Sequence, residues 1–361
     1  MKIYIKCDDN FKVNILDANY NFIKQVSDKI INIELENDEY IKIYVKDKES
    51  ELIRLSNLIS ELEVIYNESK DKLEVNLFNY NESNYGEVRV VTLKDEKNLF
   101  FRDDKSKVIN ILLPKDYSNE KKYGLLIAFD SQNIYDAKKV GNYTSKNDPY
   151  GGWQVEATLS KTKDVYNKEY IVVGIEDCDK YRDIELTPSS RNYKFKDILY
   201  ELEETSLLKG EMEYFNDFIN ETLFPYILSN YNIDLDEVGI FGASSGGLAS
   251  YYIGLKNSSK YKFILTFTPA TGFIKDESLK DFYGKIDFNS RLPFIFYFQG
   301  KKGWLEELLY TVNIDLIKNL VDSNYSKDLI DEYLEESYEH NEVAWRFSFN
   351  YAMSVYLKRG K

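Results

Sequence analysis

One serine in this sequence has neighbours suited to an exposed nucleophile. The segment Gly242–Gly247 reads Gly-Ala-Ser-Ser-Gly-Gly and contains the pattern G-x-S-x-G. An apolar stretch that ends at Phe241 precedes it, and residues 248–253 can begin a helix. A sharp strand-to-helix turn strains its central residue, so the positions two before and two after it must be small. The pattern predicts that Ser244 is a catalytic nucleophile; the alternative is an ordinary turn of small residues.

The same turn predicts donors that stabilise negative charge. The backbone N–H of Ser245 would face an oxyanion bonded to Ser244, helped by the N-terminus of the following helix. A second backbone donor is expected on the loop after the apolar strand that ends at Phe129, from Gln132 or Ser131. Such an arrangement is typical of acyl transfer.

A serine hydroxyl is a weak nucleophile at neutral pH and needs a base within hydrogen-bonding reach. The chain contains one histidine, His340. It lies C-terminal to Ser244, as in the chain order serine, acid, histidine, and it precedes residues 342–347, which favour a helix. His340 is therefore the predicted base, with a structural or merely exposed histidine as the alternative.

The third group should be an acid that orients the imidazole and stabilises its protonated form. It is expected after the penultimate strand, residues 293–298, where Glu306 and Glu307 are adjacent carboxylates. Acids also favour the first turn of a helix for electrostatic reasons alone. The sequence does not decide between the two glutamates.

Elements that could position these residues follow from residue 98 onward. Continuous apolar runs predict strands buried on both faces, and apolar residues at helical spacing predict helices between them. The runs are residues 108–114, 124–129, 170–175, 238–242 and 293–298; the helices are 210–230 and 304–320. Strands alternating with helices indicate an α/β domain with a mostly parallel sheet.

The first 95 residues have a different pattern. Apolar and polar residues alternate in segments such as 41–45 and 73–77, separated by polar clusters, which is typical of half-buried antiparallel strands. We expect a small all-β, sandwich-like domain over residues 1–95 and the α/β domain over residues 96–361. The alternative is a β-extension of a single larger domain.

Composition excludes several classes of function. The net charge of −14 argues against nucleic-acid and anionic-membrane partners, which bind through a basic excess. Two cysteines, Cys7 and Cys178, and one histidine are too few ligands for a Cys/His structural zinc site. The sequence begins without an apolar leader and has no membrane-spanning run, so we expect a cytoplasmic protein.

Six segments together resemble the putative-esterase family, which includes esterase D, enterochelin esterases, feruloyl esterases and mycolyltransferases. Residues 110–117 match a strand leading to Pro and Tyr, and residues 129–136 match a D-G-Q-N-x-F-D loop. Residues 151–153 match a tryptophan segment, and residues 182–188 match an R-x-x-E-x-T-P stretch. Residues 223–227 match a helix end before the nucleophile strand, and residues 340–345 match an H-x-x-x-x-W block. The match runs from about residue 100 to the C-terminus.

The resemblance implies an α/β-hydrolase fold and hydrolysis of an ester or thioester without a metal or organic cofactor. It also implies Ser244 as nucleophile, His340 as base, and the backbone N–H groups of Gln132 and Ser245 as the oxyanion hole.

The acid departs from the family pattern. Gly303 stands where many members carry the acid, while the mycolyltransferase branch implies Glu306. Some siderophore esterases imply a dyad without an acid. Ser131 replaces the usual glycine of the D-G-Q loop, which would narrow the acyl entrance. Residues 1–95 resemble the extra N-terminal module of enterochelin-type esterases, which implies that they cover the site and select substrate.

The predicted activity is therefore that of a serine carboxylester hydrolase acting on a small-molecule ester, first a siderophore ester or acylated small molecule. Trp153 and Arg182 are predicted substrate-binding residues, and Arg191 and Lys194 join Arg182 as candidate cations for an anionic siderophore. For the three cations, ordinary solvated surface or structural ion pairing is the favoured alternative. The alternatives are a feruloyl or acetyl carbohydrate esterase, an acyltransferase, and a non-catalytic binding protein on a hydrolase scaffold. The sequence gives no oligomeric state.

Overall fold

The computed structural model describes residues 2–32, 39–77, 85–95, 105–135, 151–177, 181–190 and 209–360. The chain forms two compact units. The first unit contains Met1–Gly86, Asn133–Glu169 and Glu336–Lys361, and the second contains Glu87–Gln132 and Tyr170–Glu335. Each is described by itself below.

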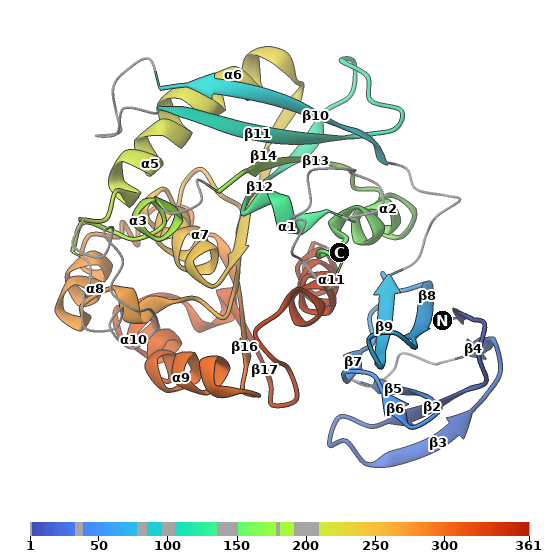
Figure 1. The fold of residues 1–361 in the computed structure, drawn as a ribbon. Coiled ribbons are helices and arrows are strands. Elements are labelled where there is room, and N and C mark those ends of the chain that lie inside the picture. Colours follow the sequence, from blue (N-terminus) through green and yellow to red (C-terminus); the bar gives the residue numbers. More distant parts are fainter. Residues whose placement is uncertain are drawn as a thin grey trace. The chain divides into compact units, whose positions relative to one another are not determined.

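The second unit is built on an eight-stranded sheet in the order β10-β11-β13-β12-β14-β15-β16-β17 (Figure 1). From β13 to β17 every neighbouring pair is parallel, whereas β11 runs antiparallel to β13. The strands are β10 (Tyr85–Lys94), β11 (Ser106–Pro114), β12 (Tyr123–Phe129), β13 (Tyr170–Ile175), β14 (Ile233–Ala243), β15 (Phe263–Phe267), β16 (Phe294–Gly300) and β17 (Ile330–Glu335). The prediction of a mostly parallel sheet is confirmed.

Helices of the second unit connect these strands. The helix expected over residues 210–230 consists of α5, a π-helical turn at Ile219–Leu223 and α6, and Pro225 near the start of α6 lacks the N–H of a regular helix residue. The helix expected over 304–320 is divided into α9 and α10. The helices are α1 (Ser131–Ile134), α3 (Arg182–Glu185), α5 (Met212–Phe218), α6 (Phe224–Asn230), α7 (Ser245–Lys256), α8 (Asp276–Tyr283), α9 (Trp304–Asn313) and α10 (Leu316–Asp322).

The core of the second unit lies between the sheet and these helices. Central strands β12, β13 and β16 are buried along their whole length, as their continuous apolar runs predict, and so is β15, which was not predicted. Helix α7 packs against β14 and β15, where Leu248 and Ile253 join Ile240 and Ile264 in one apolar cluster. The sheet thus provides a rigid base for the turn between β14 and α7.

The first unit contains two small sheets. One has the order β4-β1-β8-β9, and the other has the order β3-β2-β5-β6 with β7 also paired to β5. Burial alternates along β1 and β2, as expected for strands with one covered face. The strands are β1 (Lys2–Cys7), β2 (Phe11–Leu16), β3 (Phe22–Val26), β4 (Ile30–Asn32), β5 (Tyr40–Val45), β6 (Lys48–Glu49), β7 (Ile53–Arg54), β8 (Glu61–Asn67) and β9 (Lys72–Leu77).

One strand pair of the first unit differs from the antiparallel expectation. Strand β1 pairs with β8 in parallel, from Tyr4 opposite Glu61 to Cys7 opposite Val64. Parallel neighbours need a long connection, and the chain from β2 to β7 supplies it. The remaining described strand pairs in these two sheets are antiparallel.

Two helices distant in sequence complete the first unit, α2 (Val155–Tyr166) and α11 (Glu342–Lys358). The amide of Asn350 in α11 accepts a hydrogen bond from Ser56 Oγ at 2.5 Å and donates one to Thr158 Oγ1 in α2 at 3.0 Å. Ser354 Oγ donates to Asn57 Oδ1 at 2.7 Å. The two units are thus not contiguous stretches of chain, and the domain boundary near residue 95 stays a prediction.

Among the residues that the structure describes, no helix is both long and apolar enough to cross a membrane.

Candidate active site

Ser244 occupies a sharp turn between β14 and α7. Its backbone has φ 56° and ψ −124°, a conformation that residues with a side chain rarely adopt. The Ser244 N–H donates to the carbonyl of Phe267 at 3.0 Å, and its carbonyl accepts from Leu248 N at 2.9 Å and Ala270 N at 3.0 Å. Hydrogen bonds to both neighbouring elements therefore hold the strained residue in place, and its side chain remains partly exposed.

Both glycines of the G-x-S-x-G pattern are sterically required. A Cβ on Gly242 would lie 2.4 Å from the carbonyl oxygen of Gly246, and a Cβ on Gly246 would lie 2.7 Å from Asp130 Oδ2. The second contact joins the first turn of α7 to the loop after β12. The close approach of these two segments is the structural reason for a glycine at position 246.

The loop after β12 also contains a residue with positive φ, Asp130, at 57°. Gln132 follows in α1, and its side chain makes two hydrogen bonds to Asp177: Nε2 donates to Asp177 Oδ2 at 2.6 Å, and Oε1 accepts from the Asp177 N–H at 3.2 Å. These bonds fix the segment whose backbone is the predicted second oxyanion donor.

The side chain of Ser131 is fully buried, and its Oγ accepts a hydrogen bond from Asn110 Nδ2 in β11 at 2.7 Å. The serine in place of the usual glycine therefore faces the sheet. This corrects the expectation that Ser131 narrows an acyl entrance, because a side chain without exposed surface cannot line one.

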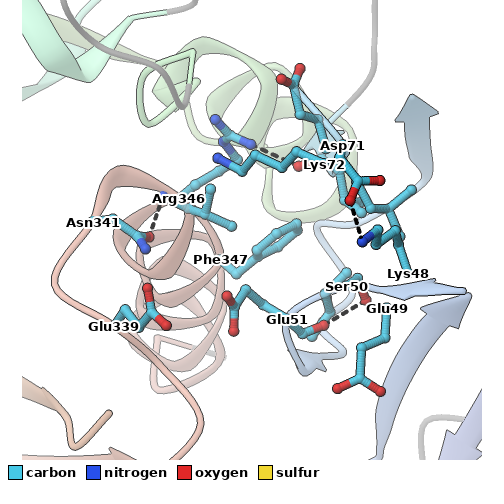
Figure 2. Close-up of a pocket in the computed structure, with 15 residues that line it drawn as sticks. Lys48, Glu49, Ser50, Glu51, Asp71, Lys72, Glu339, Asn341, Arg346 and Phe347 are labelled. Carbon is cyan, nitrogen blue, oxygen red and sulfur yellow. Dashed lines mark hydrogen bonds and ion pairs between the residues drawn. The ribbon is translucent and has the colours of Figure 1, made fainter. Parts of the chain in front are cut away.

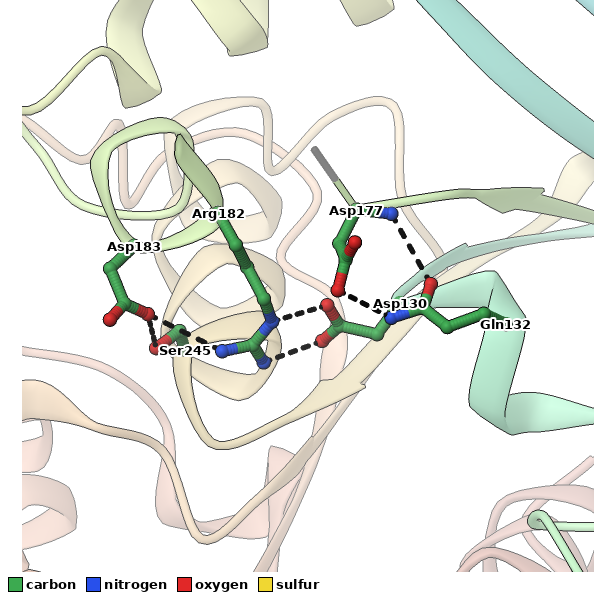
Figure 3. A network of polar contacts seen from close by, with 6 residues as sticks. All are labelled: Asp130, Gln132, Asp177, Arg182, Asp183 and Ser245. Atoms are coloured by element: carbon green, nitrogen blue, oxygen red, sulfur yellow. Dashed lines mark hydrogen bonds and ion pairs between the residues drawn. The ribbon is translucent and has the colours of Figure 1, made fainter. Parts of the chain in front are cut away.

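Arg182 bridges two carboxylates (Figure 3). Its Nε and Nη2 donate to the two oxygens of Asp130 at 2.6 and 2.8 Å, and Nη1 lies 3.3 Å from Asp183 Oδ1. Asp183 Oδ1 also accepts from Ser245 Oγ at 2.9 Å. Burial acts to lower the pKa of the Arg182 guanidinium, but Asp130 and Asp183 raise it above its ordinary value. These contacts favour a structural role over the predicted substrate contact.

Helix α3 is itself fixed to the sheet. Glu185 in α3 forms an ion pair with Lys107 in β11, and both side chains are almost completely buried. The R-x-x-E stretch thus supplies two ion pairs that point in different directions, one toward Asp130 and one toward β11.

The two candidate acids have different surroundings. Glu306 has no exposed surface, and its Oε2 accepts from Gln299 Nε2 at 2.8 Å, whereas Glu307 is exposed on the same helix. Gln299 Oε1 accepts from Asn313 Nδ2 at 2.9 Å, and Asn313 Nδ2 also donates to the carbonyl of Pro269 at 2.8 Å. A buried polar network therefore connects Glu306 to the loop that hydrogen-bonds Ser244.

His340 lies just before α11 and is partly exposed. Its ring makes an edge-to-face contact with Trp345, with centroids 4.9 Å apart and an interplanar angle of 87°. Asn341 begins α11 by accepting from the N–H groups of Val343 and Ala344, both at 3.1 Å. His340 belongs to the first unit, and Ser244 and Glu306 belong to the second, so the pairing of these three residues stays a prediction.

Trp153 is only 3% exposed. Its ring lies 5.6 Å from Trp345 and 6.4 Å from Phe349, centroid to centroid, so it packs against α11. Gly152, which precedes it, has φ 76°, and a Cβ there would lie 2.0 Å from the carbonyl oxygen of Tyr135. This burial favours a packing role for the Gly-Gly-Trp segment over the predicted substrate contact of Trp153.

The first unit contains a pocket of about 270 Å³ beside the segment that carries His340 (Figure 2). Glu339, Asn341 and Phe347 line one side of it, and residues 48–51 and 71–75 line the other. Arg346 is nearly inaccessible, because its guanidinium donates to the carbonyls of Gly152 and Val75 at 2.6 to 3.0 Å. Lys48 is paired with Asp71 at 2.6 Å. Lys48 is thus already paired with a carboxylate, and backbone carbonyls already occupy donors of Arg346.

Sequence reasoning missed the residues that support the site. Asp130, Asp177, Asp183, Gln299 and Asn313 all contact predicted site residues or the loops that hold them. Asp130 and Asp183 lie inside residues 129–136 and 182–188, two of the segments that resemble the family, and this resemblance was the sequence signal that could have identified them. Arg191 and Lys194, the other predicted cations, lie outside the described residues. Within the described ranges, no group of three or more His, Cys, Asp or Glu residues could hold a metal ion.

Comparison with known proteins adds to this geometry. Residues 104–354 match the family described as putative esterase. No curated protein matches the sequence. Among solved structures, an IroE-like serine hydrolase from Shewanella oneidensis is 16% identical, with a TM-score of 0.55 over 74% of this chain and 79% of that one.

Two further structures are similar. The enterobactin esterase FES from Shigella flexneri is 11% identical, with a TM-score of 0.54 over 98% of this chain and 89% of its own. The ferulic acid esterase AmCE1/Fae1A from Anaeromyces mucronatus is 15% identical, with a TM-score of 0.52 over 79% and 95%. The likeness to FES extends over the N-terminal strands as well. These likenesses confirm the α/β-hydrolase fold.

Proposed function

Because the chain belongs to the putative esterase family, we propose that it hydrolyses carboxylic esters through an acyl-enzyme on Ser244. The observation that carries the proposal is the conformation of Ser244, with φ 56° and ψ −124° at the end of β14. A turn of this kind presents the serine hydroxyl at the carboxyl edge of a parallel sheet, where α/β-hydrolases perform their chemistry.

In this mechanism His340 removes the proton from Ser244 Oγ while Oγ attacks the ester carbonyl carbon. The carbonyl oxygen becomes an oxyanion that the backbone N–H groups of Ser245 and Gln132 stabilise. The protonated His340 then gives its proton to the leaving alcohol, and the C–O bond breaks. Water attacks the resulting acyl-enzyme by the same steps in reverse and releases the acid.

Chain connectivity supports His340 as the base. Strand β17 is parallel to β16, so its carboxyl end lies at the same edge of the sheet as the carboxyl ends of β14 to β16. His340 follows Glu335, the last residue of β17, by five residues. Five residues span at most about 18 Å, so the histidine is tethered to the edge where Ser244 lies.

The proposed third member is Glu306. Its complete burial and its hydrogen bond to Gln299 suit an acid held in one orientation, whereas Glu307 is exposed and has the ordinary place of an acid in the first turn of a helix. Glu306 would orient the imidazole of His340 and stabilise its protonated form.

The proposed substrate is a small-molecule carboxylic ester. The structure of FES was solved in the presence of 2,3-dihydroxy-N-benzoyl-glycine. Siderophore-type esters are therefore the first substrates to test, beside a feruloyl ester and a simple acyl ester.

The test begins with Ser244→Ala and His340→Ala. Each should lower kcat for a chromogenic acyl ester by several orders of magnitude, and the double variant should be little worse, because the groups act as a unit. A fluorophosphonate should label the wild type and not Ser244→Ala. A Ser244→Ala protein that cleaves the ester at a comparable rate would refute the proposal.

A matched pair of variants tests the acid. Glu306→Gln should reduce kcat strongly, while Glu307→Gln, with the same chemical change one residue away, should leave it unchanged. Equal activity of the two variants would leave a Ser244–His340 dyad as the mechanism.

A further inference from the structure

The two proposed oxyanion donors lie on different segments of the second unit. Gln132 follows β12, whereas Ser245 begins α7 after β14. Such donors are effective only when their separation is fixed, because their advantage over water is that they need no reorganisation during the reaction. The contacts that fix this separation therefore belong to the catalytic apparatus.

A continuous chain of polar contacts joins the two segments (Figure 3). Asp130, two residues before Gln132, receives both hydrogen bonds of a bidentate pair from Arg182. Arg182 lies 3.3 Å from Asp183 through Nη1, and Asp183 accepts from the Ser245 hydroxyl at 2.9 Å. This series of contacts thus begins two residues before Gln132, which supplies one donor, and ends at Ser245, which supplies the other.

We propose that Arg182 and Asp183 are positioning residues that hold the two oxyanion-donor segments at a fixed separation. The inference rests on the proposed esterase function. It favours the structural ion-pairing alternative for Arg182 over the substrate-binding role.

Backbone strain explains why such a connection is needed. Asp130 and Ser244 both have positive φ, at 57° and 56°, and a conformation of this kind persists only where surrounding contacts enforce it. The bidentate pair with Arg182 constrains Asp130 directly. A Cβ at position 246 would lie 2.7 Å from Asp130 Oδ2, so the Asp130 side chain packs directly against the first turn of α7.

The helix that carries Arg182 and Asp183 is itself held to the sheet. Arg182 and Asp183 belong to α3, and Glu185 in the same helix is paired with buried Lys107 in β11. The carbonyl of Asp183 also accepts from the Thr187 hydroxyl. Because α3 is fixed to the sheet, Arg182 holds Asp130 relative to a rigid element.

The local charge favours positioning over the binding of an anionic substrate. Three donor nitrogens of Arg182 face Asp130 and Asp183, and Asp177 accepts a hydrogen bond from Gln132 nearby. Within this network of described residues, the guanidinium is thus already paired with carboxylates of the protein. An anionic ligand would have to displace an aspartate from Arg182 and approach the others.

The experiment compares Arg182→Lys and Arg182→Ala with Arg291→Lys and Arg291→Ala, using one neutral and one anionic ester. Arg291 forms an exposed ion pair with Asp236 at 3.1 Å in the same unit and serves as the matched control. Removal of one oxyanion donor lowers kcat about 10²- to 10³-fold, so displacement of a donor should lower it about 10- to 100-fold. We expect this loss for both esters in the Arg182 variants, with KM changed less than about twofold.

Two further measurements exclude a merely structural effect. Added guanidinium ion should restore part of the kcat of Arg182→Ala and none of that of Ser244→Ala. Ser245→Ala, which keeps the backbone N–H and loses only the hydroxyl bond to Asp183, should lower kcat mildly. Combined with Arg182→Lys, it should lower kcat less than the product of the two single effects, because both act on one contact chain.

Each outcome separates this inference from the proposed function. If the Arg182 variants raise KM for the anionic ester alone while kcat is retained, Arg182 binds substrate and the inference is wrong. Unchanged kinetics in folded Arg182 variants would also overturn it, while Ser244→Ala still reports on the esterase mechanism. Where Arg182→Ala does not fold, Arg182→Lys and Ser245→Ala carry the same test.

Discussion

The strain at Ser244 makes a prediction about stability that is independent of any substrate. With φ 56° and ψ −124°, position 244 is in a region that glycine adopts without a steric cost. Relief of such strain is worth about 1 to 3 kcal/mol, and the greater freedom of glycine in the unfolded chain opposes it by about 0.5 to 1 kcal/mol. Ser244→Gly should therefore be more stable than Ser244→Ala by about 1 kcal/mol.

Ser250 provides the control for this prediction. It lies in α7, is fully buried and donates to the carbonyl of Gly247 at 2.9 Å. In a helix interior glycine is less favourable than alanine by about 1 kcal/mol, so Ser250→Gly should be less stable than Ser250→Ala. The order of the alanine and glycine variants should thus be opposite at positions 244 and 250.

The assay is thermal unfolding followed by circular dichroism, with urea unfolding as a second measurement. A difference of 1 kcal/mol corresponds to about 2 to 4 °C in Tm for a unit of this size. Both Ser244 variants should be inactive, so activity does not distinguish them and only stability does. A Ser244→Gly variant no more stable than Ser244→Ala would show that the turn is not strained.

Three other predictions concern buried contacts. Trp153→Ala should lower the free energy of unfolding by about 3 to 5 kcal/mol in urea titration, because a large buried ring is removed. Lys107→Met should lower the free energy of unfolding by about 3 to 5 kcal/mol, because it leaves Glu185 buried without its partner. Lys107→Met combined with Glu185→Leu should be nearly neutral. Equal stability of the single and double variants would contradict the importance of this ion pair. Gln299→Leu removes a donor to Glu306, so we expect a destabilisation of about 1 to 3 kcal/mol and a lower kcat in the ester assay, and a change in KM alone would argue against the role of this network.

Several strands of the second unit could be predicted closely from the sequence, because strands buried on both faces leave uninterrupted apolar runs; β15 (Phe263–Phe267), although fully buried, was not among the predicted runs. The run over 170–175 is β13 in full, and that over 124–129 lacks only the first residue of β12. Breaks inside the expected helices were not predicted. Periodicity over 304–320 continues across the break between α9 and α10, because Leu309, Leu316 and Leu320 are buried on both sides of it. A pattern of burial does not reveal where hydrogen bonding is interrupted.

Long-range contacts in the first unit were not predictable in the same way. Alternation indicates that β1 and β8 are half-buried, but it carries no information on which strand is the neighbour or in which direction it runs. The joining of β-strands from the first 77 residues to α2 and α11 depends on individual polar pairs such as Asn350 with Ser56. No local pattern in the sequence marks these pairs.

At the candidate site, local geometry could be predicted better than the role of individual side chains. The small residues around Ser244 follow from the turn itself, and the contacts of Gly242 and Gly246 agree with that reasoning. Arg182 illustrates the limit. An arginine in a matched segment is a candidate anion-binding group, and only the positions of Asp130 and Asp183 show that its donors face carboxylates of the protein.

The charge around this connection bears on the choice of substrate. An anionic ester would meet Asp130, Asp177 and Asp183 around the segments of the proposed oxyanion hole, with Arg182 already paired. The charge of the acyl part should therefore matter more than its size, because like charges oppose the approach of an anion before any contact forms. We expect a neutral acyl ester to be cleaved faster than an anionic ester of equal size, so among siderophore-type esters an uncharged one should be cleaved faster than an anionic one. Raising the ionic strength should narrow the difference as these charges are screened.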